Sequence, residues 1–171
     1  MDYPSKNAKL HAAVAQTQHN TTSWVGHRNF DNKDIIAGQT FVAPTEADIE
    51  AIEIFPTVIT RSGHVQITVF QFDDQQNQWG ASIGSATVDI SKENHEQWVP
   101  FHLNGLHLHK GKTYGFKLES NDTYVGLGEA AGSAMQPPYR EGSEWKFINN
   151  EAMPRRFNYF SLAFKVDVKA A

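Results

Sequence analysis

Apolar and polar residues alternate with a period of two along much of the chain, and this pattern restricts the fold more than any other feature. In the stretch "HVQITVFQF", Val65, Ile67 and Val69 are separated by mostly polar residues. Successive side chains of a β-strand point to opposite faces, so such a stretch forms a strand with one buried face. The chain is therefore expected to consist of strands that each bury one side in a core.

Several other stretches show the same alternation. "TYGFKLE" places Tyr114, Phe116 and Leu118 on one face. "YFSLAFKVDV" is the longest case, and its even-numbered residues are expected to face the core while the odd-numbered ones (Tyr159, Ser161, Ala163, Lys165 and Asp167) face solvent. Weaker strand signals cover the ranges 39–43, 49–55, 86–90, 97–103, 124–127 and 144–148.

Polar or glycine-bearing turns separate these stretches. They are "RSG", "DDQQNQWG", "SKENHE" and "HKGK", which begin at residues 61, 73, 91 and 109. About nine short strands with one apolar face each are typical of an antiparallel β-sandwich or jelly roll. Strands do not alternate with helices, which argues against a parallel α/β sheet. We therefore expect one all-β sandwich domain over residues 23–171.

Residues 1–22 lack the alternation and are expected to form an N-terminal arm. Ser5 suits the N-cap of a short helix over residues 5–19. The apolar stripe of such a helix has three positions, which are too few to hold it in place alone. The arm is therefore expected to be loosely attached, and it is the segment through which the chain would form an oligomer.

The composition is that of a folded soluble protein and excludes several functional classes. Of the 171 residues, 40% are hydrophobic and 20% are charged, which suits one domain with a proper core. The net charge of −4 provides no basic surface for nucleic acid or anionic lipid. No apolar run approaches the roughly 18 residues that span a bilayer. The absence of cysteine excludes disulfides, thiolate metal sites and cysteine nucleophiles.

The start of the chain carries no localisation signal. "MDYPSKNAKLHAAVAQTQHN" lacks the apolar centre of a secretory signal, as expected of a cytoplasmic protein. A secreted chain whose signal had been removed would start in the same way, so the compartment stays open.

The stretch "FHLNGLHLHKGKTYGF" places three histidines within eight positions: His102, His107 and His109. An H-x-H pair on a strand points to one side, and a cupin-like jelly-roll enzyme uses such a pair to bind a metal. The cupin glutamate is missing at its spacing, and Lys110 and Lys112 would repel a cation. We therefore expect an exposed strand edge in which Leu106 and Leu108 face the core, and no metal site.

Several stretches together resemble non-catalytic β-sandwich modules, similar to the carbohydrate-binding modules of bacterial carbohydrate-active and surface proteins. The stretches are "AGQTFVAPTEADIEAIEIF", "VPFHLNGLHLHKGKTYGFKL", "YREGSEW" and "YFSLAFKVDV", and the resemblance covers residues 35–168. It implies a β-sandwich that binds a carbohydrate. Family members often hold a structural calcium, but Asp31, Asp34 and Asp122 form no recognisable loop motif here. No cofactor is therefore expected.

Sugar recognition needs flat aromatic faces and planar hydrogen-bonding groups. The loops and strand ends of the chain offer both. The candidate ligand-binding residues are Trp24, Asn121, Asp122, Tyr124, Tyr139, Arg140 and Trp145.

Glu129 in "GLGEAAG" is an acid among small residues, and a catalytic carboxylate would need a partner such as Asp122 or Glu141. The simpler interpretation is that Glu129 pairs with Arg140 or caps a loop. No nucleophile elbow, phosphate-binding loop or H-E-x-x-H motif is present, so no catalytic residue is assigned.

Three functions follow, in order of preference. The first is a non-catalytic module that binds glycan or another polar surface ligand through loop aromatics. The second is the metal-dependent jelly-roll enzyme that uses the three histidines. The third is a structural or assembly module that associates through the N-terminal arm.

Overall fold

Two antiparallel β-sheets form the protein, as the alternating pattern predicts. The structure is a computed structural model, and it describes residues 11–149 and 151–169. A short 3₁₀ turn at Lys92–Asn94 is the one helical segment within these ranges. The strands are β1 (His11–Gln16), β2 (Thr21–Arg28), β3 (Lys33–Val42), β4 (Ala47–Ile54), β5 (Pro56–Ile59), β6 (Gly63–Asp73), β7 (Gln78–Ile90), β8 (Val99–Leu108), β9 (Thr113–Glu119), β10 (Tyr124–Ala131), β11 (Glu144–Ile148), β12 (Arg155–Phe157), β13 (Phe160–Leu162) and β14 (Phe164–Val168).

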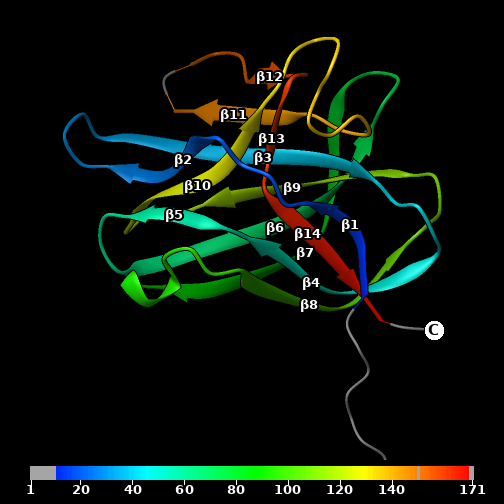
Figure 1. Cartoon of the computed structure of the whole chain (residues 1–171), viewed down its shortest axis with the longest axis horizontal. Helices are drawn as coiled ribbons and strands as arrows, with labels where there is room; N and C mark the ends of the chain where they lie inside the picture. The colour runs from blue at the N-terminus through cyan, green and yellow to red at the C-terminus, as the bar shows by residue number, and fades with distance from the viewer. Residues whose placement is uncertain (1–10, 150, 170–171) are drawn as a thin grey trace, which may run out of the picture.

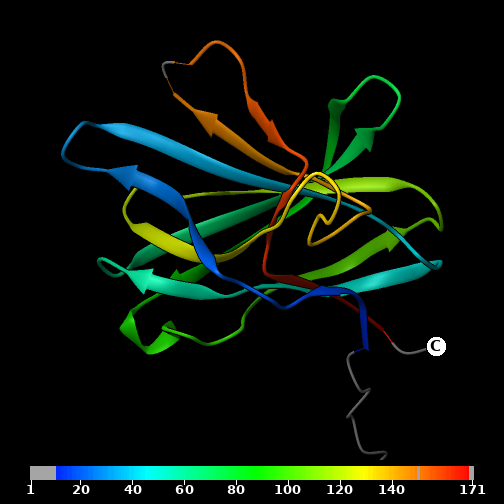
Figure 2. The same cartoon turned by 45° about the horizontal axis from the view of Figure 1, so that its top comes forward.

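The two sheets differ in size. The smaller has the strand order β1-β14-β4-β8, and the larger has the order β13-β10-β2-β3-β9-β6-β7. Strand β5 also pairs with β10, β11 also pairs with β3, and β12 pairs with β11. In Figure 1, β4 and β8 run along the lower side of the molecule and β2 and β3 along the upper side. The β11–β12 hairpin and the tip of the β6–β7 hairpin project from that upper side (Figure 2).

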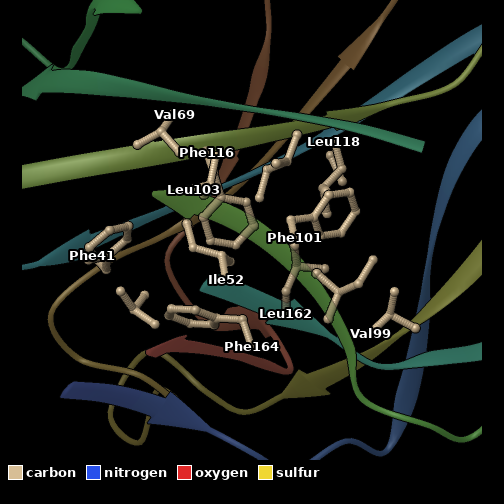
Figure 3. Packing of buried hydrophobic residues seen from close by; sticks show 14 of the residues in the cluster. Phe41, Ile52, Val69, Val99, Phe101, Leu103, Phe116, Leu118, Leu162 and Phe164 are labelled. Atoms are coloured by element: carbon tan, nitrogen blue, oxygen red, sulfur yellow. The ribbon is translucent and has the colours of Figure 1, made fainter. Parts of the chain in front are cut away.

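The core lies between the sheets and is rich in aromatic residues. Phe41 and Phe116 come from the larger sheet, and Phe101 and Phe164 come from the smaller one (Figure 3). All four are fully buried. The aliphatic positions predicted from the alternation, such as Val65, Ile67 and Val69, are buried in the same cluster. The sequence pattern thus identifies the core of both sheets correctly.

The strand count and the N-terminal helix need correction. The described residues form fourteen strands rather than about nine, because several short strands carry too few apolar residues to give a clear signal. Of the helix expected over residues 5–19, the part from His11 to Gln16 is strand β1, which pairs with β14 at the edge of the smaller sheet. The remainder of the expected arm up to residue 10 lies outside the described residues.

The closing stretch is two strands instead of one. β13 pairs with β10 in the larger sheet, β14 pairs with β4 in the smaller one, and Ala163 connects them. Ser161, Ala163 and Asp167 are buried, contrary to the expectation that they face solvent. Ser161 and Ala163 are enclosed because the chain crosses from one sheet to the other there, whereas Asp167 lies in β14 between β1 and β4. Burial and the neighbouring Glu53 raise the pKa of Asp167 to about 7.

Candidate functional site

A hollow of about 320 Å³ opens between the β11–β12 hairpin and strands β2 and β10. Its volume lies near the lower end of the range for small-molecule sites, about 300–1,000 Å³. Polar, charged and aromatic side chains share its wall. The lining residues are Thr22, Ser23, Trp24, Arg28, Ile35, Tyr124, Glu129, Glu144, Lys146, Ile148, Arg155, Phe157 and Phe160.

Strand β11 gives the hollow its polar wall through simple alternation. Glu144, Lys146 and Ile148 line the hollow. Trp145 and Phe147, on the opposite face of the strand, pack against Trp79 with ring centroids 5.9 and 5.8 Å away. Pairing of β11 with β3 fixes this register, with Glu144 opposite Gln39. The apolar face of β11 thus anchors the strand and directs its charged residues into the hollow.

Two carboxyl groups meet inside the hollow. Glu144 on β11 is 1% exposed and Glu129 on β10 is 7% exposed. Burial, followed by the hydrogen bond to Glu129, raises the pKa of the Glu144 carboxyl far above its usual range. Two carboxylates in contact cannot both ionise at low cost, so the pair holds a proton at neutral pH. The raised pKa places that proton on Glu144.

Lys146 is one of three basic side chains that line the hollow, together with Arg28 and Arg155. Its Nζ donates a hydrogen bond to the backbone oxygen of Trp24 at 2.8 Å. Burial lowers the pKa of Lys146, although the nearby carboxyls of Glu144 and Glu129 oppose that shift. This ammonium group ties β11 to β2 across the hollow.

Two buried oxygen atoms of lining residues lack a hydrogen-bond partner among the described residues. They are Oγ of Ser23 and Oε1 of Glu144. Buried polar atoms in folded proteins are nearly always satisfied by protein or by a bound molecule, because burying them without a partner is unfavourable. These two atoms therefore mark the part of the wall of the hollow where a hydrogen-bonding partner is missing.

Aromatic rings line the rest of the hollow. Trp24 and Tyr124 stack on each other at 4.8 Å with an angle of 14° between their planes. Phe157 and Phe160 meet edge to face at 5.5 Å. At the rim, the guanidinium of Arg155 pairs with Glu151.

The structure brings together two of the seven residues proposed from the sequence, Trp24 and Tyr124. Asn121 lines a different hollow beside His64 and Glu119. Asp122 accepts hydrogen bonds from the backbone N–H of His64 at 2.8 Å and contacts His64 Nδ1 at 2.7 Å. Those hydrogen bonds lower the pKa of Asp122 to about 2. Asp122 thus ties the β9–β10 turn to β6.

The other three proposed residues lie outside the hollow. The ring of Tyr139 packs edge-on against Phe164 at 5.5 Å, and burial raises its pKa to about 12. Arg140 is exposed and donates to the backbone oxygen of Met135. Trp145 is buried on the far face of β11, as described above. None of these three lines the hollow that contains Trp24.

Sequence reasoning missed the charged half of the hollow. Glu144, Lys146 and Ser23 gave no separate signal, because an alternating strand does not reveal which of its faces is enclosed. "EWKF" suggested that Trp145 was the ligand-facing residue, whereas its neighbours face the hollow. For Glu129, the structure shows Glu144 as the neighbouring carboxyl, in place of the Asp122 or Glu141 considered above.

The three acids and three histidines considered as metal ligands do not form one cluster. Asp31 pairs with Arg28, and Asp34 lies 2.7 Å from His27 Nδ1. His107 on β8 and His109 just after its end are exposed, Leu108 between them is buried, and β8 is an edge strand of the smaller sheet. The exposed strand edge is therefore confirmed. The grouping of His102 with these two is wrong, because they gather with Glu46 instead.

Comparison with known proteins shows the fold and little else. No protein-family model and no curated protein matches the chain. A crystal structure of the cysteine protease and lectin-like domains of Cwp84, a surface layer associated protein of Clostridium difficile, is similar with a TM-score of 0.53 and 13% sequence identity. The match covers 82% of this chain and 32% of that chain. At this identity the likeness shows a shared fold alone.

Within the described residues, no helix is long and apolar enough to cross a membrane.

Proposed function

We propose that the protein is a non-catalytic binding module that holds an uncharged glycan in the hollow between β2, β10 and β11. One observation carries the proposal: the buried Oγ of Ser23 and Oε1 of Glu144 line the hollow, and neither has a hydrogen-bond partner among the described residues. A ligand hydroxyl that formed hydrogen bonds with these two oxygen atoms would remove the free-energy cost of leaving them unpaired. Such a site rejects ligands without a hydroxyl, because the two atoms would then stay unpaired.

The chemistry of the hollow suits sugar hydroxyls, which both donate and accept hydrogen bonds. The protonated carboxyl of Glu144 and the hydroxyl of Ser23 can each donate and accept hydrogen bonds, and Lys146 adds a further donor. The Trp24–Tyr124 stack adds apolar surface for the carbon-bound hydrogens of a pyranose ring. The proton on Glu144 reduces the negative charge of the hollow, and basic side chains line it too. The hollow therefore favours a neutral ligand over a cationic one.

The carboxyl pair supports binding rather than hydrolysis. In glycoside hydrolases the two carboxyls flank the scissile bond and lie about 5 Å or more apart. Here Glu129 lies close enough to Glu144 to help raise the pKa of its carboxyl, so the two acids are immediate neighbours rather than groups that flank a bound sugar. The solved structure with a similar fold includes a lectin-like domain, which accords with a binding role.

A glycan array tests the proposal, with Ser23→Ala as the decisive variant. We expect the wild-type protein to retain at least one neutral glycan and Ser23→Ala to bind it about 10-fold more weakly, since one hydrogen bond is worth about 1 kcal/mol or more. The unfolding free energy of Ser23→Ala should stay within about 0.5 kcal/mol of wild type or rise, because its hydroxyl lacks a partner in the free protein.

The matched aromatic pair is Trp24→Ala and Trp98→Ala. Trp98 is also half-buried, but it packs against Phe55 and beneath Lys165 and does not line the hollow. Glycan binding should be lost in the first variant and kept in the second. A folded wild-type protein that binds no neutral glycan, or equal binding by wild type and Ser23→Ala, would contradict the proposal.

A further inference from the structure

A second cluster of polar side chains gathers where β8 ends beside the start of β4, and none of its members lines the hollow. His107 Nε2 lies 2.6 Å from Oε2 of Glu46, and His109 Nδ1 lies 3.3 Å from the same oxygen. One atom from each of the three side chains lies within 4.8 Å of the other two. Two imidazole nitrogens and a carboxylate oxygen therefore converge on one point.

A fourth side chain orients the cluster. Asp48 on β4 pairs in register with His107 on β8, and its Oδ1 lies 2.7 Å from His107 Nδ1. A histidine that donates from one ring nitrogen to a carboxylate presents its other nitrogen as a ligand, which is the usual arrangement behind metal-bound imidazoles. The backbone N–H of Lys110 donates to Oε1 of Glu46 at 3.2 Å, so Oε2 is the oxygen turned toward the histidines.

We propose that Glu46, His107 and His109 bind one divalent late-transition metal ion, of which Zn²⁺ is the type, with Asp48 orienting His107. Tetrahedral bonds of about 2.0–2.1 Å place neighbouring ligand atoms about 3.3 Å apart. His109 and Glu46 already have that separation, at 3.3 Å. His107 and Glu46 must move apart from 2.6 Å, which is a small change for two exposed side chains. The fourth coordination position is left to water.

The charges around the cluster favour a small divalent cation of this class. The carboxylates of Glu46 and Asp48 carry two negative charges, which a divalent ion neutralises. Ca²⁺ and Mg²⁺ prefer all-oxygen sites, whereas imidazole nitrogen suits zinc, nickel and copper. Three lysines oppose the binding of a cation in part. Lys110 and Lys112 follow His109 in the sequence, and the backbone N–H of Lys169 donates to the backbone oxygen of Asp48.

The sequence does not reveal this site because Glu46 lies far from the histidines along the chain. The three histidines suggested a trio that included His102, yet His102 lies opposite Ala51 on β4 and outside the cluster. That position makes His102→Ala a matched control on the same strand.

Calorimetric titration of the tag-free, metal-free full chain with ZnCl₂ tests the proposal. We expect one saturable site, with binding weakened at least about 10-fold in His109→Ala and in Glu46→Gln, and about 10-fold in Asp48→Asn. His102→Ala should bind as wild type does. Zinc should also raise the melting temperature of wild type and of His102→Ala, but not that of His109→Ala.

Two results would overturn the proposal. One is the absence of saturable Zn²⁺ binding to the folded wild-type protein. The other is binding that His102→Ala weakens as much as His109→Ala does, because the cation would then associate with the histidines of the strand in general. Melting of each variant without metal confirms that it is folded.

Discussion

Phe164→Ala is expected to lower the free energy of unfolding by about 3–5 kcal/mol. The ring of Phe164 is fully buried and lies 5.6 Å from that of Phe116, 6.3 Å from that of Phe41 and 5.5 Å from that of Tyr139. Phe164 begins β14, the strand that pairs with both β1 and β4 in the smaller sheet. The substitution therefore opens a cavity at the contact between the two sheets. Urea unfolding measures the loss as a lower midpoint at an unchanged slope.

Phe30→Ala is the control for this change. Phe30 is 83% exposed, so the same substitution there should alter the unfolding free energy by less than about 1 kcal/mol. If Phe164→Ala destabilised the protein no more than Phe30→Ala does, the packing of the two sheets described above would be wrong.

Glu144→Gln is expected to make the stability of the protein less dependent on pH. Burial and Glu129 raise the pKa of Glu144 in the folded state, so the folded protein keeps this proton at pH values where the unfolded chain has lost it. A rise in pH from about 5 to 8 should therefore lower the stability of wild type, by at most about 1.4 kcal/mol per pH unit from this group. Glutamine resembles the protonated carboxyl in shape and in its ability to donate, and it does not titrate.

Thermal or urea unfolding at several pH values measures this effect. The advantage of Glu144→Gln over wild type should grow from pH 5 to pH 8, by about 2–4 kcal/mol in total. Glu93→Gln makes the same chemical change at an exposed carboxyl and should follow the wild-type curve. Asp167 also has a raised pKa, but it is present in all three proteins and cancels in the comparison. Parallel curves for wild type and Glu144→Gln would show that Glu144 is ionised in the folded state.

The sequence is a good guide to the fold where one face of a strand is buried and the other is wet. Strand β6 matches the predicted alternation because it has one face on the core, whereas in β9 the face that carries Thr113 and Gly115 is buried as well. β1 was missed because "HAAVAQ" has small residues and only one large apolar side chain, Val14, on its buried face. The break at Ala163 was missed because the alternation continues through it, while the strand changes partners.

The candidate site was predictable only in its aromatic part. Aromatic residues are visible in a sequence, and Trp24 and Tyr124 do line the hollow. The approach of Glu144 to Glu129 depends on β11 pairing with β3 rather than with β10, and strand order leaves no trace in the alternation. The cluster of Glu46, His107 and His109 likewise depends on the pairing of β4 with β8, which the alternation does not reveal.

The most direct test of the account asks whether a glycan enters the hollow. The chain has four tryptophans, and their indole N–H groups give four separate signals in a ¹⁵N-correlated NMR spectrum. Neutral mono- and oligosaccharides are added one at a time to the labelled protein, and Trp24→Phe assigns the signal of Trp24. The account predicts that at least one sugar shifts the Trp24 signal in a saturable way and leaves those of Trp79, Trp98 and Trp145 in place. Saturable shifts at Trp79 or Trp145 without Trp24, or no shift with any sugar, would contradict it.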